Sequence, residues 1–186
     1  MRWEVLGLLT QLAFDPHPNP PPEYMGRGNW ERIAGQNEVE RELAMPTRTA
    51  DVVWNGGLTD GKGQIKLASG AFDGPYDWRS RSADGTSTNP EELLAAAHAG
   101  CFSMAFSHVL GQGGFPPKRI HTVAKVTLEQ QGEGFVIPRI ELETEAEVPK
   151  IDEATFQTMA KGAKDGCPVS KALAGVQISL KAKLLA

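Results

Sequence analysis

The chain contains two cysteines, Cys101 and Cys167, and their thiols are the most reactive groups that the sequence offers. They are 167 − 101 = 66 positions apart, so spacing alone does not indicate whether they meet. Two cysteines are too few for a disulfide-stapled secreted scaffold, and they lack the paired C-x-x-C spacing of a zinc site. A disulfide between them would therefore favour a redox role over a purely structural one.

The neighbouring residues give the two thiols different predicted reactivities. Pro168 suits the first position of a helix, which places Cys167 at the N-cap, where the positive helix end lowers a thiol pKa. Cys101 instead falls inside an apolar helix, where desolvation raises the pKa unless a cation comes close. Arg79 or Arg81, in the preceding segment, could supply that cation. The alternatives are an inert core cysteine at 101 and a helix cap without chemistry at 167.

Other kinds of chemistry have less support in the sequence. His98, His108 and His121 could join the cysteines as metal ligands, but no local pair has zinc-finger spacing, so core or surface histidines are the simpler interpretation. No glycine-rich phosphate loop and no G-x-S-x-G nucleophile turn occurs. With 19 basic and 23 acidic residues, the net charge is −4. The chain has no basic stripe, which argues against a nucleic-acid partner.

A long central helix is predicted to carry Cys101. Asn89 can cap its start, Pro90 suits the first helical position, and Glu91 and Glu92 complement the helix dipole. The following residues, 93–106, lack a wide polar face, so protein should surround the helix on nearly all sides. The glycines and prolines of 111–117 end it.

The remaining periodicity predicts an α+β domain with an antiparallel-rich sheet. Residues 71–87, rich in Gly, Asp, Pro and Ser, are predicted to form a long loop. A short turn at Gly132 to Gly134 joins two of the strands. The expected strands are 47–54, 64–69, 120–130, 135–148 and 176–184, and the expected further helices are 152–165 and 167–173.

The first 44 residues differ from the rest of the chain. Five prolines between positions 16 and 22 preclude a helix or a central strand there. We therefore expect 1–44 to be a disordered tail or a mis-called extension, with the domain at 45–186 starting at Met45. Glu4 interrupts the pattern of a signal peptide, and the longest apolar run, 93–110, is too polar for a bilayer. These features predict a cytoplasmic protein without a membrane partner.

Three segments together resemble the OsmC/Ohr family of osmotically inducible and organic-hydroperoxide-resistance proteins. They are 88–94 (TNPEELL), 96–105 (AAHAGCFSMA) and 166–170 (GCPVS). The resemblance extends over 45–186, and the last two segments are more similar to the OsmC branch than to the Ohr branch. It implies an OsmC-like fold and a stress-defence enzyme that reduces organic hydroperoxides, and more weakly hydrogen peroxide, to alcohols or water.

The resemblance also implies a role for each site residue. Cys101 would attack the peroxide and become a sulfenic acid, and Cys167 would resolve it as a Cys101–Cys167 disulfide. Arg81 would hold the thiolate and the peroxide, while Glu91, ten positions later, would orient its guanidinium. A lipoylated protein or another dithiol would reduce the disulfide, with no bound cofactor or metal.

The same resemblance implies an intertwined homodimer with active sites at the subunit interface. A central helix that is nearly apolar all round agrees with such an interface. Two other classes of function stay open from the sequence. One is a non-enzymatic dimer that holds an apolar ligand, and the other is a metal-binding sensor.

Overall fold

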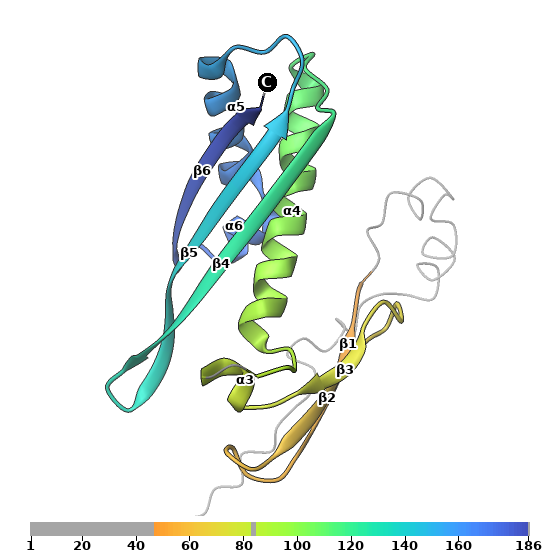
Figure 1. Ribbon diagram of the computed structural model, residues 1–186, viewed down its shortest axis with the longest axis vertical. Coiled ribbons are helices and arrows are strands. Elements are labelled where there is room, and N and C mark those ends of the chain that lie inside the picture. The colour runs from red at the N-terminus through yellow and green to blue at the C-terminus, as the bar shows by residue number, and fades with distance from the viewer. Residues whose placement is uncertain (1–46, 83–84, 186) are drawn as a thin grey trace, which may run out of the picture. The chain divides into compact units, whose positions relative to one another are not determined.

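The computed structural model describes residues 47–82 and 85–185 of the chain. The predicted tail, 1–44, lies outside these residues, so the expectation for it stays a prediction. All of the elements below belong to the unit Arg48–Ala186. Figure 1 shows them in chain order, coloured from orange to blue.

The first three strands form an antiparallel meander. They are β1 (Ala50–Asn55), β2 (Lys62–Leu67) and β3 (Asp73–Tyr76), paired in the order β1-β2-β3. Gly63 lies opposite Tyr76, and a Cβ added to this glycine would come within 2.1 Å of the tyrosine ring. A glycine at this position therefore leaves room for the tyrosine ring against the neighbouring strand.

The predicted loop 71–87 is wrong in part, because it contains β3 and a short helix, α3 (Arg79–Ser82). The glycine and proline content of this segment, which ordinarily indicates a loop, hid β3 for a physical reason. β3 is an edge strand, where Pro75 can replace an N–H donor without interrupting an interior ladder. The segment holding Arg81 is therefore anchored at both ends by regular structure.

The central helix, α4 (Pro90–Gln112), begins where the sequence predicts. The Asn89 side chain accepts a hydrogen bond of 2.8 Å from the Glu92 N–H, and Pro90 occupies the first turn. By length and composition α4 is apolar enough to cross a membrane, a test that the core helix of a soluble domain also passes. Within this chain only one stripe of it is buried: Glu91, His98, Phe102, Phe106 and Leu110.

The second sheet has the order β4-β5-β6, with β4 (Arg119–Gln131), β5 (Gly134–Glu147) and β6 (Gln177–Leu185). β4 and β5 form the predicted hairpin and pair antiparallel, whereas β5 and β6 pair parallel. The described strands therefore form two three-stranded sheets in which three of the four pairings are antiparallel. In β5 every second residue from Ile140 to Ala146 is buried, as one covered sheet face requires.

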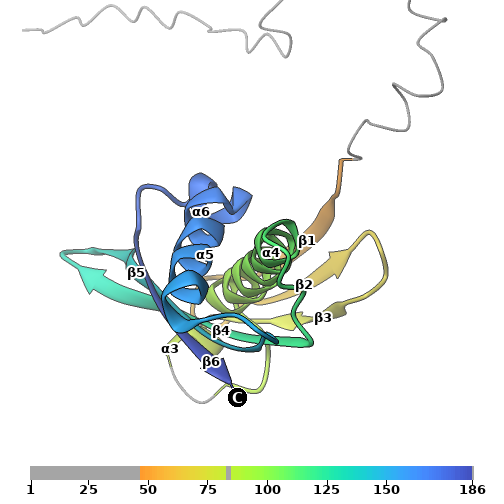
Figure 2. The same ribbon diagram turned by 90° about the horizontal axis from the view of Figure 1, so that it is seen from above.

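Two further helices connect β5 to β6 and make the parallel pairing possible. α5 (Glu153–Gly166) has Asp152 as its N-cap, and α6 (Pro168–Ala172) follows after Cys167. Seen from above, α4, α5 and α6 lie on one side of the second sheet (Figure 2). The core between these layers is centred on three aromatic rings: the Phe106 centroid lies 5.7 Å from that of Phe102 and 5.4 Å from that of Phe156.

Candidate active site

The fold brings the two cysteines into contact. Cys101 lies near the middle of α4, and Cys167 is the single residue between α5 and α6. Their Sγ atoms are 3.2 Å apart, and both are free thiols. A disulfide bond, at about 2.0 Å, needs an approach of only about 1.2 Å. The two thiols are thus placed to form and break a bond with each other.

The two thiols differ in exposure. Cys167 is completely buried and belongs to the hydrophobic core cluster, whereas Cys101 is partly exposed at its margin. A small molecule that arrives from solvent therefore meets the Cys101 sulfur first.

The pKa values of the two thiols move in opposite directions. Burial raises the pKa of Cys101, the Val169 N–H opposes this rise in part, and the contact with Cys167 raises the pKa further. Burial acts on Cys167 in the same direction, but the Ser170 N–H, the Cys101 thiol and the Ser170 hydroxyl outweigh it and lower its pKa. Both directions were predicted from sequence. In this chain Cys167 is therefore the more acidic thiol.

A buried histidine and serine lie beside the cysteines. His98 is fully buried, and its Nε2 atom lies 2.9 Å from the Ser170 hydroxyl oxygen. From the sequence, His98 was expected to be only a core residue or a metal ligand, and Ser170 was not singled out. The sequence does contain a clue to their position. His98 lies three residues before Cys101, and Ser170 lies three residues after Cys167, a spacing that puts each pair on one helix face.

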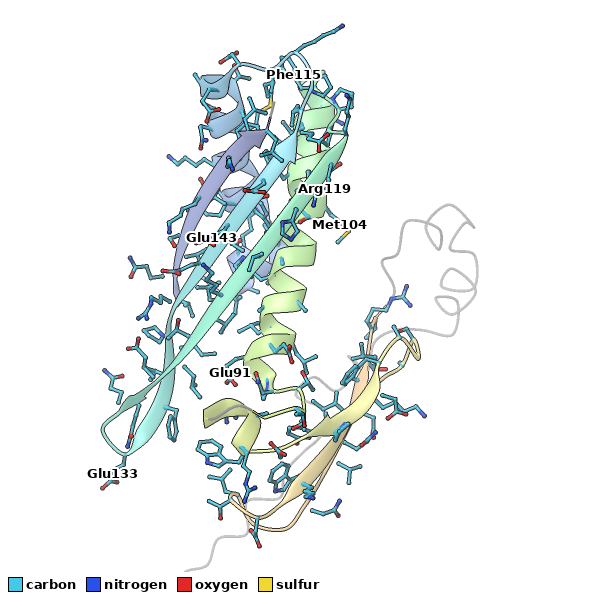
Figure 3. The ribbon with its side chains drawn as sticks, in the orientation of Figure 1. Glu91, Met104, Phe115, Arg119, Glu133 and Glu143 are labelled. Carbon is cyan, nitrogen blue, oxygen red and sulfur yellow. The ribbon has the colours of Figure 1, made fainter. Side chains whose placement is uncertain are left out.

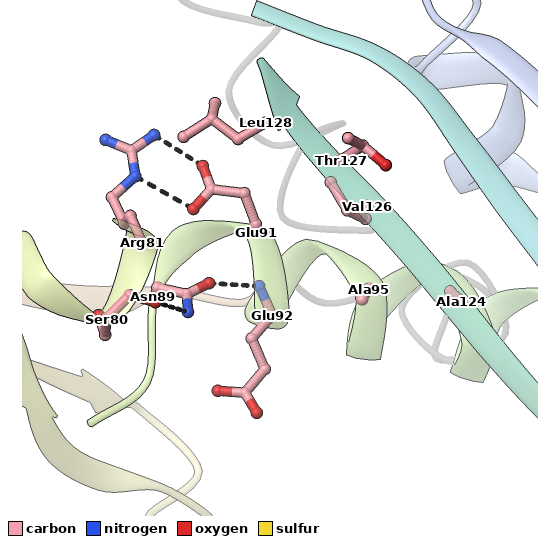
Figure 4. Close-up of a pocket in the computed structure, with 10 residues that line it drawn as sticks. All are labelled: Ser80, Arg81, Asn89, Glu91, Glu92, Ala95, Ala124, Val126, Thr127 and Leu128. Atoms are coloured by element: carbon pink, nitrogen blue, oxygen red, sulfur yellow. Dashed lines mark hydrogen bonds and ion pairs between the residues drawn. The ribbon is translucent and has the colours of Figure 1, made fainter. Parts of the chain in front are cut away.

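The other predicted pair, Arg81 and Glu91, forms a bidentate ion pair. Arg81 Nη2 lies 2.6 Å from Glu91 Oε1, and Nε lies 3.1 Å from Oε2, as the dashed lines in Figure 4 mark. The Glu91 side chain is 11% exposed. The Trp78 ring lies 5.3 Å from the guanidinium carbon, close enough for a cation–π contact. Arg79 is exposed on the same short helix.

Backbone tethers hold Arg81 against the start of α4. The Asn89 amide donates a 2.8 Å hydrogen bond to the Ser80 carbonyl, and the Ser80 hydroxyl donates one to the Thr88 carbonyl. The residue that caps α4 therefore also fixes α3. As a result, α3 holds the Arg81 guanidinium in a fixed position beside the start of α4.

A pocket of about 480 Å³ opens beside this ion pair (Figure 4). One side of it is charged or polar, and the other side is mainly apolar and is contributed by β4 together with Ala95 of α4. The polar side consists of Ser80, Arg81, Asn89, Glu91 and Glu92, and the other side consists of Ala95, Ala124, Val126, Thr127 and Leu128. Neither cysteine lines this pocket.

One chain does not bring the four predicted residues into one site. Glu91 and Cys101 are ten residues apart on α4, which is about 15 Å along the helix axis. The ion pair and the thiol pair are therefore two separate groups. His108 and His121 are exposed and belong to neither, and within residues 47–82 and 85–185 no three His, Cys, Asp or Glu side chains gather as metal ligands.

Comparisons with known proteins agree on one family. Residues 83–181 match the sequence model of OsmC, described as OsmC-like protein. The chain is 46% identical over 121 residues to the peroxiredoxin OsmC of Escherichia coli strain K12, which covers 64% of this chain and 85% of that protein.

Solved structures give the same result. The organic hydroperoxide resistance protein OhrB of Bacillus subtilis is 28% identical with a TM-score of 0.54, covering 74% of this chain and 98% of its own. An organic hydroperoxide resistance protein from Elizabethkingia anophelis is 26% identical with a TM-score of 0.58, covering 76% and 97%.

Proposed function

Since the chain belongs to the OsmC family, we propose that it is a thiol-dependent peroxidase that reduces organic hydroperoxides, and more weakly hydrogen peroxide. The observation that carries the proposal is the contact between two free thiols of unequal exposure, Cys101 and Cys167, 3.2 Å apart. The names of the relatives, peroxiredoxin and organic hydroperoxide resistance protein, support the same chemistry.

Cys101 is the thiol that attacks the peroxide, because the Cys167 sulfur has no exposed surface. The Cys101 thiolate attacks the terminal peroxide oxygen, the O–O bond breaks, and the alkoxide takes up a proton and leaves as the alcohol. Cys101 is then a sulfenic acid. The sulfur has been oxidised by two electrons, and the peroxide has been reduced by two.

Cys167 resolves this intermediate. Its thiolate attacks the Cys101 sulfur, the S–S bond forms, and the sulfenic oxygen leaves as hydroxide, which is protonated to water. The lowered pKa of Cys167 favours this step, because the attacking species is the thiolate.

An external dithiol, such as a lipoyl group, then reduces the disulfide. Its thiolate attacks the accessible sulfur of Cys101, and Cys167 leaves as the more acidic and therefore better leaving thiolate. The second thiol of the reductant displaces Cys101. The enzyme returns to two thiols and the reductant becomes a disulfide, which requires no bound cofactor and suits a reducing cytoplasm.

A second copy of the chain completes the site. Burial raises the pKa of Cys101, so its thiolate needs a cation, yet the Arg81 that would supply it lies on α3 and pairs with Glu91, about 15 Å along α4 from Cys101. A homodimer in which Arg81 of one chain meets Cys101 of the other removes this separation. Supporting this arrangement, Met104 projects from α4 with 71% of its surface exposed (Figure 3), and the Arg81 pocket is open.

The test is peroxide consumption with dihydrolipoamide as the reductant. We expect the parent to consume cumene hydroperoxide faster than hydrogen peroxide, and Cys101→Ser to lose the activity. Cys167→Ser should still form one sulfenic acid per chain, trapped by dimedone, without turning over. An inactive parent, or a Cys101→Ser variant with full activity, would contradict the proposal and favour a dimer that only binds an apolar ligand.

A further inference from the structure

The His98–Ser170 pair is a buried polar contact that the mechanism above does not use. Both residues lie in the packed interior, with His98 fully buried and Ser170 8% exposed. Their contact joins α4 to α6, the two helices that also carry or flank the cysteines. Burying a polar pair costs desolvation free energy, which its hydrogen bonds must offset.

The tautomer of His98 follows from its second nitrogen. Nδ1 is buried and has no hydrogen-bond partner among the described residues. If the Ser170 hydroxyl donated to Nε2, the proton on Nδ1 would be a buried donor without an acceptor. If Nε2–H donates to the Ser170 oxygen, only a lone pair on Nδ1 stays unused, and the hydroxyl hydrogen is free for another acceptor.

The Cys167 sulfur, at the N-cap of α6, is an acceptor for that hydrogen. Ser170 lies three residues after Cys167 in the first turn of α6. Its N–H and hydroxyl lower the pKa of the Cys167 thiol. Burial lowers the pKa of His98, which keeps the ring neutral and the Nε2–H a simple donor near neutral pH. Cys101 is the other titratable group in contact with this sulfur.

We propose that His98 is a positioning residue for the resolving thiolate: it donates Nε2–H to the Ser170 oxygen and so keeps the Ser170 hydroxyl hydrogen directed at the Cys167 sulfur. In this arrangement His98 donates to Ser170, and Ser170 donates to the Cys167 sulfur. Its effect is on the fraction of Cys167 present as thiolate. The consequence of this thiolate fraction for turnover rests on the proposed peroxidase function. The pKa of Cys167 can be measured without assuming that function.

The experiment is an ultraviolet titration of the Cys167 thiolate in a Cys101→Ser background, with the double variant lacking both thiols as the blank. It uses no peroxide, so its outcome is separate from that of the peroxidase assay. Ser170→Ala should lower the thiolate fraction at neutral pH about tenfold, the effect of one hydrogen bond to a charged group. His98→Phe should lower it about threefold, since the hydroxyl stays but turns freely.

Two further variants separate positioning from packing. His98→Gln keeps an N–H donor at a similar reach and should restore most of the thiolate fraction, whereas His108→Phe, at an exposed position of the same helix, should change nothing. Equal losses in His98→Gln and His98→Phe would overturn the proposal, because the ring would then act through packing alone. If His98→Phe fails to fold, an unchanged titration of Ser170→Ala overturns it by itself.

Discussion

The thiol pair and the Arg81–Glu91 ion pair are carried by the same helix, but they stand in opposite environments. The sulfur atoms lie in or beside the hydrophobic core, and each is in contact with its chemical partner. The ion pair lines an open pocket at the start of α4 and has no thiol to act on within its own chain. The difference teaches that one chain brings the two thiols together by itself, whereas in the proposed dimer the cation that activates the thiolate comes from the second chain.

The largest expected effect is on the free energy of unfolding, and it differs between the two regions. Phe102 follows Cys101, is fully buried and packs in the cluster that holds Cys167. Phe102→Ala should lower the free energy of unfolding by about 3–5 kcal/mol. Phe135 is 48% exposed and makes an edge contact with Trp78, so Phe135→Ala should cost about 1 kcal/mol. Urea unfolding of both variants measures the difference, and equal losses would contradict the contrast.

Arg81→Ala should have the next largest effect, on activity and not on stability. Removing the charge that stabilises a developing anion costs about 10²- to 10³-fold in kcat/KM. The matched control is Arg79→Ala, which removes an exposed arginine two positions away on α3. Initial rates with cumene hydroperoxide decide the point. Similar losses in both variants would mean that Arg81 acts only through general surface charge.

Glu91→Gln should have a smaller effect than the loss of Arg81. The amide keeps one hydrogen-bond acceptor for the guanidinium but removes the charge-assisted bidentate pair, so we expect about a tenfold drop in kcat/KM. Because Glu91 acts through the orientation of Arg81, Glu91→Gln should add little to the loss in Arg81→Ala. A double-mutant cycle measures this coupling, and fully additive losses would contradict the positioning role.

The smallest effect is a pH dependence of stability in the thiol region. Burial lowers the pKa of His98 from its ordinary value of 6.5, so the unfolded chain takes up a proton that the folded chain refuses. The free energy of unfolding should therefore fall as the pH is lowered through that value. His98→Phe should lack this component. Urea unfolding at about pH 7.5 and about pH 5.5 checks it, and an identical pH dependence in both proteins would contradict it.

Much of the fold follows from local signals in the sequence. The Asn89 cap and Pro90 fixed the start of α4, and Asp152 did the same for α5, because capping is a contact between near neighbours. β3 was missed because an edge strand tolerates the Gly and Pro that ordinarily indicate a loop. Nonlocal contacts were harder to predict.

The site was predictable where residues carry a family pattern or a local effect. The positions of both cysteines, and the direction of each pKa shift, followed from the helix N-cap and from burial. The His98–Ser170 contact joins residues 72 positions apart and has no motif of its own. The separation of Arg81 from Cys101 was also not foreseen, since Arg81 lies on α3, outside the helix that carries Cys101, and its place depends on nonlocal contacts.

Mixed dimers test the central claim most directly. Arg81→Ala chains and Cys101→Ser chains, each inactive alone, are co-refolded and assayed with cumene hydroperoxide. If each site takes Arg81 from one chain and Cys101 from the other, random pairing should restore about a quarter of the parent activity, because half of the dimers keep one intact site of two. A mixture that stays as inactive as either variant alone, although mixed dimers form, would contradict the account.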